Sequence, residues 1–285
     1  MISITLGFLT ALVYGFTDFF GAIAAKKIRA ITVTCLSSLA GLVLLLSVSG
    51  WLGMNFTPAA IFWGLVGGAI SAIAINSLYT ALAIGPMSIA SPLTAVLSAI
   101  VPAAVGVSLG EQFSTLGWLA IGLILVAVVM VGFIPGDAVR LPSLRGLIHG
   151  LTAGIGIGFV MVCLDAAPSD SGIATIVVIR VSTAVILGIA SLISFRRRPN
   201  PGELRGAGKL WLAVILSGLL ESTANVLFTV STQLGTLTVV AVLTALYPLG
   251  TILLARLFLK EKIARVQLFG IFLALGASAL LALTH

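Results

Sequence analysis

The chain has 285 residues, of which 60% are hydrophobic and only 8% are charged. Because a soluble domain carries about 25% charged residues, this composition excludes a water-soluble globular protein and indicates that lipid surrounds most of the surface. The net charge of +7 also occurs in nucleic-acid-binding proteins, but here the positions of the basic residues have a different explanation.

Ten segments are apolar and long enough to cross a membrane, since a spanning helix needs about 20 mostly apolar residues. In chain order, the predicted helices cover approximately residues 3–25, 30–50, 58–84, 87–108, 114–134, 144–165, 172–194, 209–233, 237–257 and 264–283. The first segment contains Asp18 and lacks a basic n-region and a cleavage-site pattern, so we interpret it as a retained helix and not as a signal peptide. The predicted fold class is an all-α integral membrane protein with ten transmembrane helices.

Basic residues lie almost entirely on one side of this predicted topology. Of the 15 Lys and Arg residues, all except Arg180 fall in the connections after the first, fifth, seventh and ninth helices. The charged residues in the connections on the other side are all acidic: Glu111, Asp165 and Asp170. The positive-inside rule places the basic side in the cytoplasm, so we expect a protein of the plasma (cytoplasmic) membrane with both termini outside. Anionic lipid headgroups account for the basic loops, and no nucleic-acid partner is predicted.

The two halves of the chain resemble each other weakly. The corresponding pairs are Asn76 with Asn225, Tyr79 with Phe228, Thr80 with Thr229, and Glu111 with Glu261. A Pro- and Gly-rich join divides the chain into five-helix repeats, residues 1–138 and 139–285, which we expect to intertwine as one membrane domain. Because five is odd, the second repeat enters the membrane from the opposite side, as in many secondary transporters.

Three stretches carry a resemblance to a known family. They are "VYGFTDFFGAIAAKK" in the first helix, "YTALAIGPMSIASPLTAVLSAIVPAAVGVSLGE" in the first repeat and "VVAVLTALYPLGTILLARLFLKE" in the second. The chain resembles the EamA family of the drug/metabolite transporter superfamily along essentially its whole length. The resemblance implies two inverted five-helix repeats around a central cavity, lined by helices one, three, four, six, eight and nine. It also implies movement of amino acids or related small metabolites, often outward.

Polar residues occur inside several predicted helices, where an ionisable group costs at least about 2.5–3.5 kcal/mol. They recur at spacings of three and four residues, so that each set shares one helix face. We expect Tyr14, Asn76, Tyr79, Asn225 and Tyr247 to line a common substrate-binding space, because amide and aromatic groups orient a ligand without fixing a charge. Hydrogen bonding of the two asparagines between helices is the structural alternative.

Glu221 lies near the middle of its predicted helix, and its counterpart in the first repeat is Ala72. Three roles fit this carboxylate: binding a substrate amine, exchanging a proton as the site changes sides, or pairing with Arg180 inside helix seven. Arg180 can alternatively bind a substrate carboxylate, and an amino acid would use both residues. Asp18 is a second candidate for proton coupling, and a structural role near the cytoplasmic end of its helix fits it equally.

Prolines occur in the fourth and ninth predicted helices, where each removes a backbone hydrogen bond and bends its helix. Pro92, Pro102 and Pro248 are therefore candidate gating positions, with static bends as the alternative. In helix six, glycines recur every four residues and predict close packing against another helix. These glycines are Gly146, Gly150, Gly154 and Gly158.

The sequence shows no set of residues typical of catalysis or metal binding. Cys35 and Cys163 are isolated, and neither a Cys and His cluster nor a nucleophile with its base is recognisable. We therefore predict no catalytic residue, no metal and no cofactor, and a small-molecule substrate and the lipid bilayer as partners. The predicted function is a secondary transporter that exports amino acids or related compounds by alternating access. A channel-like facilitator, a lipid scramblase and a membrane-embedded enzyme are the alternatives, and the sequence is compatible with a monomer and with a homodimer.

Overall fold

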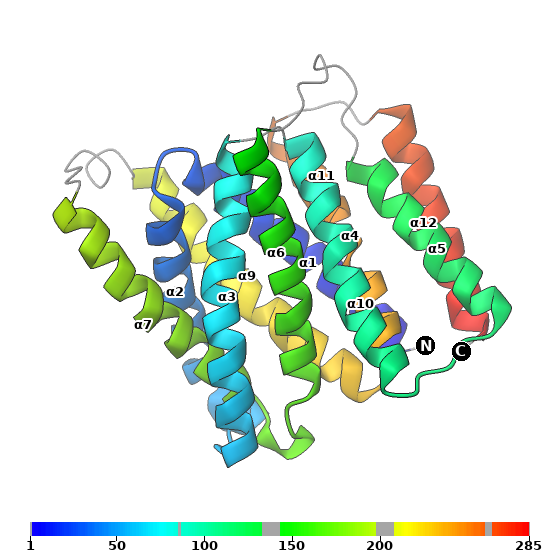
Figure 1. The fold of residues 1–285 in the computed structure, drawn as a ribbon, viewed down its shortest axis with the longest axis horizontal. Helices are drawn as coiled ribbons and strands as arrows, with labels where there is room; N and C mark the ends of the chain where they lie inside the picture. Colours follow the sequence, from blue (N-terminus) through cyan, green and yellow to red (C-terminus); the bar gives the residue numbers. More distant parts are fainter. Residues whose placement is uncertain (1, 85–86, 133–142, 198–207, 260–263, 285) are drawn as a thin grey trace.

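A computed structural model describes residues 2–84, 87–132, 143–197, 208–259 and 264–284, which fold into long helices packed side by side (Figure 1). The helices are α1 (Ile2–Ala25), α2 (Ala30–Leu52), α3 (Pro58–Ile84), α4 (Met87–Ser108), α5 (Thr115–Gly132), α6 (Leu144–Asp165), α7 (Ala174–Arg197), α9 (Gly208–Gln233), α10 (Leu237–Thr244), α11 (Pro248–Leu259) and α12 (Arg265–Thr284). A short 3₁₀ helix, η1 (Ser169–Ser171), precedes α7. The predicted all-helical fold is confirmed, and the bounds agree with the predicted segments within a few residues, with the ninth segment split into α10 and α11.

Several helices begin at a hydroxyl side chain that caps the first turn. Ser143 accepts a hydrogen bond from the Gly146 N–H at 3.1 Å, and Thr57 accepts one from the Ala60 N–H at 3.1 Å. Such caps satisfy backbone donors that have no partner inside the helix. Pro58 follows Thr57 at the first helical position, where its missing N–H costs nothing.

Helix length and composition suit a membrane environment. Within the described residues, six helices are long and apolar enough to cross a membrane, namely α1, α2, α3, α6, α7 and α9, and four further apolar segments are shorter. Large apolar side chains such as Phe62, Leu192 and Phe272 are more than half exposed on the outside of the bundle. In water this surface would be strongly unfavourable, whereas lipid tails cover it without cost.

The ninth predicted segment is interrupted before Pro248. α10 ends at Thr244, a tight turn covers residues 245–247, and α11 begins at Pro248. Because proline has no N–H and disfavours helical backbone in the preceding residue, an interruption at this point is expected. Pro92 and Pro102, in contrast, lie within the continuous helix α4.

Glycines bring particular helix pairs into close contact. The predicted packing role of the α6 glycines is seen at Gly154 and Gly158, where a Cβ would lie 2.7 Å from Leu97 and 2.7 Å from Val101 of α4. On α1, Gly15 lies directly against the Tyr247 carbonyl at the α10–α11 turn. α1 therefore packs closely on the α10–α11 segment, much as α6 packs on α4.

Three helices, α5, α12 and α7, lie at the two edges of the bundle. α5 and α12 pack against each other at one edge, and α7 lies at the opposite edge against α2 and α3 (Figure 1). Both chain ends lie at the same end of the bundle, close to the α4–α5 connection (Figure 1). Between the edges, α1 packs on α9 and α3 packs on α6.

Candidate functional site

Three polar residues of α9 lie at intervals of four along one face of the helix, and each contacts a different neighbouring helix. They are Ser217, Glu221 and Asn225, whose partners are Tyr79 of α3, Arg180 of α7 and Tyr14 of α1. Residues four apart on a helix lie above one another, so the three contacts follow one line through the bundle. We call this line the α9 polar stripe.

The central contact of the stripe is a salt bridge between Arg180 and Glu221. The distance between Arg180 Nη1 and Glu221 Oε1 is 2.9 Å, and the two side chains are 1% and 5% exposed. Glu221 is 13 residues from the start of α9 and 12 from its end (221 − 208 and 233 − 221), which places it about 20 Å from either end at 1.5 Å per residue. The pairing with Arg180, one of the three roles that the sequence left open, is thus present in this structure.

Arg180 reaches the stripe because α7 packs closely on α3. A Cβ at Gly64 or Gly68 would lie 2.5 Å from Val178 or Ser182 of α7, so both positions tolerate only glycine at this separation. The Thr183 hydroxyl also donates a hydrogen bond of 3.0 Å to the Gly68 carbonyl. These contacts fix the height of α7 against α3, and thereby the level at which Arg180 enters the bundle.

Hydrogen-bonding capacity at the salt bridge is only partly used. Arg180 Nε and Nη2 and Glu221 Oε2 are buried and have no hydrogen-bond partner among the described residues. Buried polar atoms in native proteins are nearly always hydrogen-bonded, and exceptions often mark functional sites. Two free donors on one side and one free acceptor on the other are what a ligand with a carboxylate and an amine requires.

Two tyrosines lie one helical turn on either side of the salt bridge. The Tyr14 hydroxyl donates a hydrogen bond to Asn225 Oδ1, and the hydroxyl groups of Tyr79 and Ser217 lie 2.8 Å apart. Gly21 of α1 makes room for Tyr79, because a Cβ there would overlap the phenol ring. The two tyrosines thus connect α9 with α1 and α3 above and below the ion pair.

Asp18 and Tyr247 also lie near the α9 polar stripe. Asp18 is half-buried on α1, and its charge lies near enough to interact electrostatically with Glu221 and Tyr247. Tyr247 is 3% exposed and forms part of the turn between α10 and α11. Asn76 is half-buried on α3, and no hydrogen bond joins its side-chain amide to another described residue.

The proline positions differ in what surrounds them. Pro248 is the first residue of α11 and directly follows Tyr247. Pro102 is buried in α4, and its ring would lie 3.2 Å from a Cβ at Gly158 of α6. Pro92 lies in the first part of α4. Glu261, the repeat counterpart of Glu111, lies outside the described residues.

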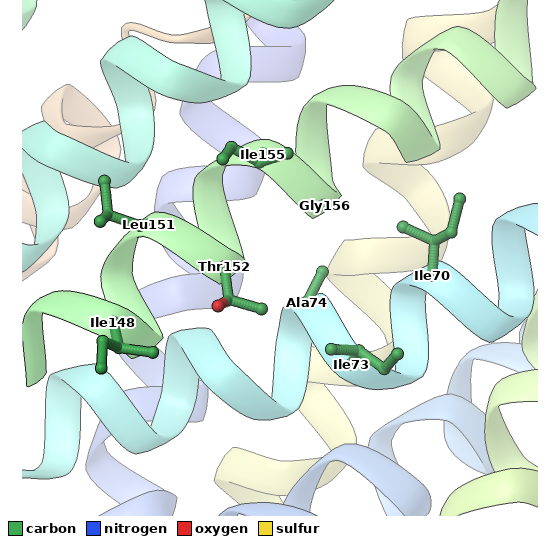
Figure 2. Close-up of a pocket in the computed structure, with 8 residues that line it drawn as sticks. All are labelled: Ile70, Ile73, Ala74, Ile148, Leu151, Thr152, Ile155 and Gly156. Carbon is green, nitrogen blue, oxygen red and sulfur yellow. The ribbon is translucent and has the colours of Figure 1, made fainter. Parts of the chain in front are cut away.

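A groove of about 460 Å³ opens between α3 and α6 (Figure 2), and neither Arg180 nor Glu221 lines it. Two of its lining residues, Ile73 and Ile148, are more than half exposed, and all are apolar apart from Thr152. The lining residues are Ile70, Ile73, Ala74, Ile148, Leu151, Thr152, Ile155 and Gly156. Both helices are long and apolar enough to cross a membrane, so the exposed apolar side chains of the groove suit contact with lipid. Its chemistry suits an acyl chain and offers nothing to bind a charged solute.

The described ranges contain no group of three or more His, Cys, Asp or Glu side chains that could hold a metal ion.

Sequence reasoning missed two residues that contribute to the α9 polar stripe, Ser217 and Gly21. Ser217 is four residues before Glu221, so the helical period alone could have identified it. Gly21 carries no sequence signal for its contact with Tyr79, which depends on how α1 and α3 are packed.

This chain resembles a known family in sequence and solved structures in fold. The family model described as the EamA-like transporter family matches residues 1–133 and 144–283, so that the two matches form repeats across the chain. No curated protein matches the sequence, whereas 28 chains of solved structures do. One of them, described only as the crystal structure of a protein, has a TM-score of 0.77 at 16% identity, over 99% of this chain and 96% of that chain. At this identity the likeness shows the fold alone.

Proposed function

The chain belongs to the EamA-like transporter family, and from this membership we propose that it is a secondary transporter which exports amino acids or related small metabolites by alternating access. The family and the apolar helices make it a multi-pass membrane protein and a transporter of the drug/metabolite type. The substrate class, the direction and the mechanism are the proposal, and they rest on the residues of the α9 polar stripe.

The buried salt bridge between Arg180 and Glu221 is the single observation that carries the choice of substrate. An α-amino acid presents a carboxylate and an ammonium group a few ångströms apart. The carboxylate is complementary in charge to Arg180, and the ammonium group is complementary in charge to Glu221. The substrate carboxylate would bind the free Nε and Nη2 of Arg180, and the ammonium group would donate to Glu221 Oε2. Each charge would thus keep a hydrogen-bonded partner of opposite sign, so neither is left unpaired in the membrane interior.

The tyrosines and Asn225 supply the remaining contacts in this proposal. When the ion pair opens, Tyr14 and Tyr79 are the nearest aromatic surfaces above and below the substrate, and Asn225 offers an amide to orient it. Asn76 and Tyr247 would complete the wall on α3 and at the α10–α11 turn. The side chain of the substrate would then select among amino acids by fit against these aromatic groups.

Alternating access is supported by how the two repeats pack. α1 and α6 begin their repeats, and each packs through glycines on the fourth segment of the other repeat, α10–α11 and α4 respectively. Similarly, α1 packs on α9 and α6 packs on α3. Such reciprocal pairing is expected of inverted repeats, residues 1–138 and 139–285, whose two arrangements open a common site to opposite sides. The Arg180 and Glu221 side chains, 1% and 5% exposed, correspond to a closed intermediate of that cycle.

Proton exchange at Glu221, with Asp18 as its neighbour, is the coupling step that we propose. Protonation of Glu221 would break the charge pairing with Arg180, and loss of that pairing would favour a rearrangement of α7 and α9. By the distribution of basic residues, the ends of the chain face outward and the basic connections face the cytoplasm of a cell whose plasma membrane holds the protein. The lipid bilayer is the only other partner that the proposal needs, for a monomer or for a homodimer.

Flux measurements with purified protein in liposomes test this function. Liposomes loaded with the proteinogenic amino acids, with and without a pH gradient, should release a subset of them in a saturable manner and show counterflow. Analogues that lack the amine or the carboxylate should not exchange. Linear, non-saturating release would favour a channel, movement of labelled lipid without solute flux would favour a scramblase, and chemical conversion of a solute would favour an enzyme.

A further inference from the structure

Glu111 lies outside the α9 polar stripe, in the connection between α4 and α5, yet its carboxylate reaches the beginning of α10. Its Oε1 accepts a hydrogen bond from the Leu237 N–H at 2.8 Å, and its Oε2 accepts one from the Thr238 N–H at 3.1 Å. Thr236, which occupies the N-cap position of α10, makes no side-chain capping hydrogen bond. A carboxylate from a different part of the chain therefore caps α10.

The α4–α5 connection is shaped to present this carboxylate. The Glu111 N–H donates a hydrogen bond of 3.0 Å to the Gly106 carbonyl, and a Cβ at Gly106 would lie only 2.6 Å from Glu111 Oε2 and 2.5 Å from the Thr238 hydroxyl. Gly110, immediately before Glu111, has a φ of 102°, a conformation that glycine adopts without strain. The backbone hydrogen bond, the space at Gly106 and the positive φ of Gly110 together direct the Glu111 side chain at the N-terminus of α10.

α10 connects this contact with the proposed substrate-binding residues. All eight residues of the helix are buried, and Tyr247 follows it after a turn held by a hydrogen bond of 3.0 Å from the Tyr247 N–H to the Thr244 carbonyl. Leu237 and Tyr247 therefore lie at opposite ends of one short, buried segment. Near the same end, Asp165 of α6 lies within electrostatic range of Glu111.

We propose that Glu111 is a positioning residue for transport: its carboxylate latches α10 to the α4–α5 connection and holds the binding site closed towards the side of the membrane without basic loops. This inference rests on the proposed transport function, because such a latch acts only where a site opens to two sides. Release of the two hydrogen bonds frees α10, carries Tyr247 away from α1, and opens a route to Asn225 and Glu221. Closure of that side reverses the sequence.

Thiol labelling tests the latch without knowledge of the substrate. The reporter is Thr229→Cys in a Cys35→Ala, Cys163→Ala background, because Thr229 lies one turn beyond Asn225 on α9 and is only 9% exposed. The measurement is the rate at which a membrane-impermeant maleimide, applied from the outer side, modifies the reporter. We expect Glu111→Ala to increase this rate by about tenfold or more, since loss of two charge-assisted hydrogen bonds shifts the population towards the open state. Glu111→Gln, which keeps one amide oxygen as acceptor, should give an intermediate rate.

A matched pair of variants at Leu237 separates the hydrogen bond from the packing. Leu237→Pro removes the N–H that donates to Glu111 but suits the first position of a helix, and the extended Thr236 (φ −93°, ψ 148°) has the conformation that precedes proline. Leu237→Ala removes the buried side chain and keeps the N–H. Labelling should be roughly threefold or more faster in Leu237→Pro than in Leu237→Ala, because only the former breaks the latch.

The outcomes distinguish the latch from general unfolding and from the proposed function. A second reporter, Ser37→Cys, is fully buried on α2 and should stay unlabelled in every variant. If Glu111→Ala exposes it, the comparison of Leu237→Pro with Leu237→Ala decides. Equal Thr229→Cys rates in the parent, Glu111→Ala and Leu237→Pro would overturn the latch even if flux is intact. Absence of any solute flux alongside the predicted labelling rates would overturn the transport function, and with it the role that we give to the latch.

Discussion

Arg180 and Glu221 form a salt bridge of 2.9 Å although the main packing partners of their helices are others. α7 packs chiefly on α3 and α2, and α9 packs chiefly on α1 and α2, so the salt bridge links two helices that otherwise contact each other little. A buried link of this kind does little for stability by itself, but it leaves a costly unpaired charge when one partner is lost.

The first prediction concerns that cost. Arg180→Met should lower the free energy of unfolding by about 3 kcal/mol or more, because it leaves the Glu221 carboxylate buried without a partner. The double variant Arg180→Met, Glu221→Gln should recover part of the loss, since no full charge then remains at the position. Thermal or denaturant unfolding in detergent micelles measures both. A double variant less stable than Arg180→Met alone would show that the two residues do not act as a pair.

The second prediction concerns the walls of the site. Asn225→Ala and Tyr79→Ala should each weaken substrate binding and change the preference among amino acids, because the two residues flank the ion pair in the proposed complex. Tyr79→Phe should reproduce Ser217→Ala, since either change breaks the same hydrogen bond of 2.8 Å, and the double variant should add little. Concentration dependence of liposome flux gives the affinities. Unchanged affinity and specificity in folded Asn225→Ala and Tyr79→Ala would remove both residues from the site.

The third prediction concerns the packing of α1 on the α10–α11 turn. A methyl group at Gly15 would overlap the Tyr247 carbonyl and lie 2.7 Å from the Gly250 Cα, so Gly15→Ala should destabilise the protein by about 1–3 kcal/mol through overpacking. Gly122→Ala on α5 is the matched control, because nothing lies within 4 Å of its Cβ position. That change should be neutral or stabilise by up to about 1 kcal/mol. Similar melting temperatures for the two variants would argue against the close approach at Gly15.

The fourth prediction concerns orientation in the membrane. Apart from Arg180, the Lys and Arg residues fall on one side of the predicted topology, which the positive-inside rule places in the cytoplasm. In intact cells, a membrane-impermeant thiol reagent should therefore label Thr284→Cys and leave Arg197→Cys unlabelled. Permeabilised cells, in which both positions react, provide the control. The opposite pattern would invert the orientation without affecting the fold.

Most of the helices could be predicted because hydrophobic length is a strong signal in a membrane protein. Gly154 and Gly158 on α6 were likewise recognisable as packing positions, since a stripe of small residues at a spacing of four has few other uses in lipid. The split of the ninth segment before Pro248 was only partly predictable. Proline indicated the bend, but not that the helix would end at Thr244.

Sequence reasoning named two residues of the α9 polar stripe, Glu221 and Asn225, but only part of the contacts that these residues make. Helical spacing placed Glu221 and Asn225 on one face, yet spacing within one helix says nothing about which neighbour faces it. The hydrogen bond between Tyr14 and Asn225 depends on the rotation of α1 against α9, and the room for Tyr79 depends on Gly21. Glu111 shows the same limit, because its role as a cap joins residues 126 positions apart.

Flux through Glu221→Gln in liposomes tests the central claim most directly. Glutamine keeps the volume of the side chain and an oxygen that Arg180 can bind, but it removes the negative charge that the proposal assigns to the substrate amine and to proton exchange. The variant should fold and insert as the parent does, and should lose most amino-acid flux at every pH measured. Flux near that of the parent at several pH values would contradict the account and would leave the Arg180–Glu221 pair as a structural element of the bundle.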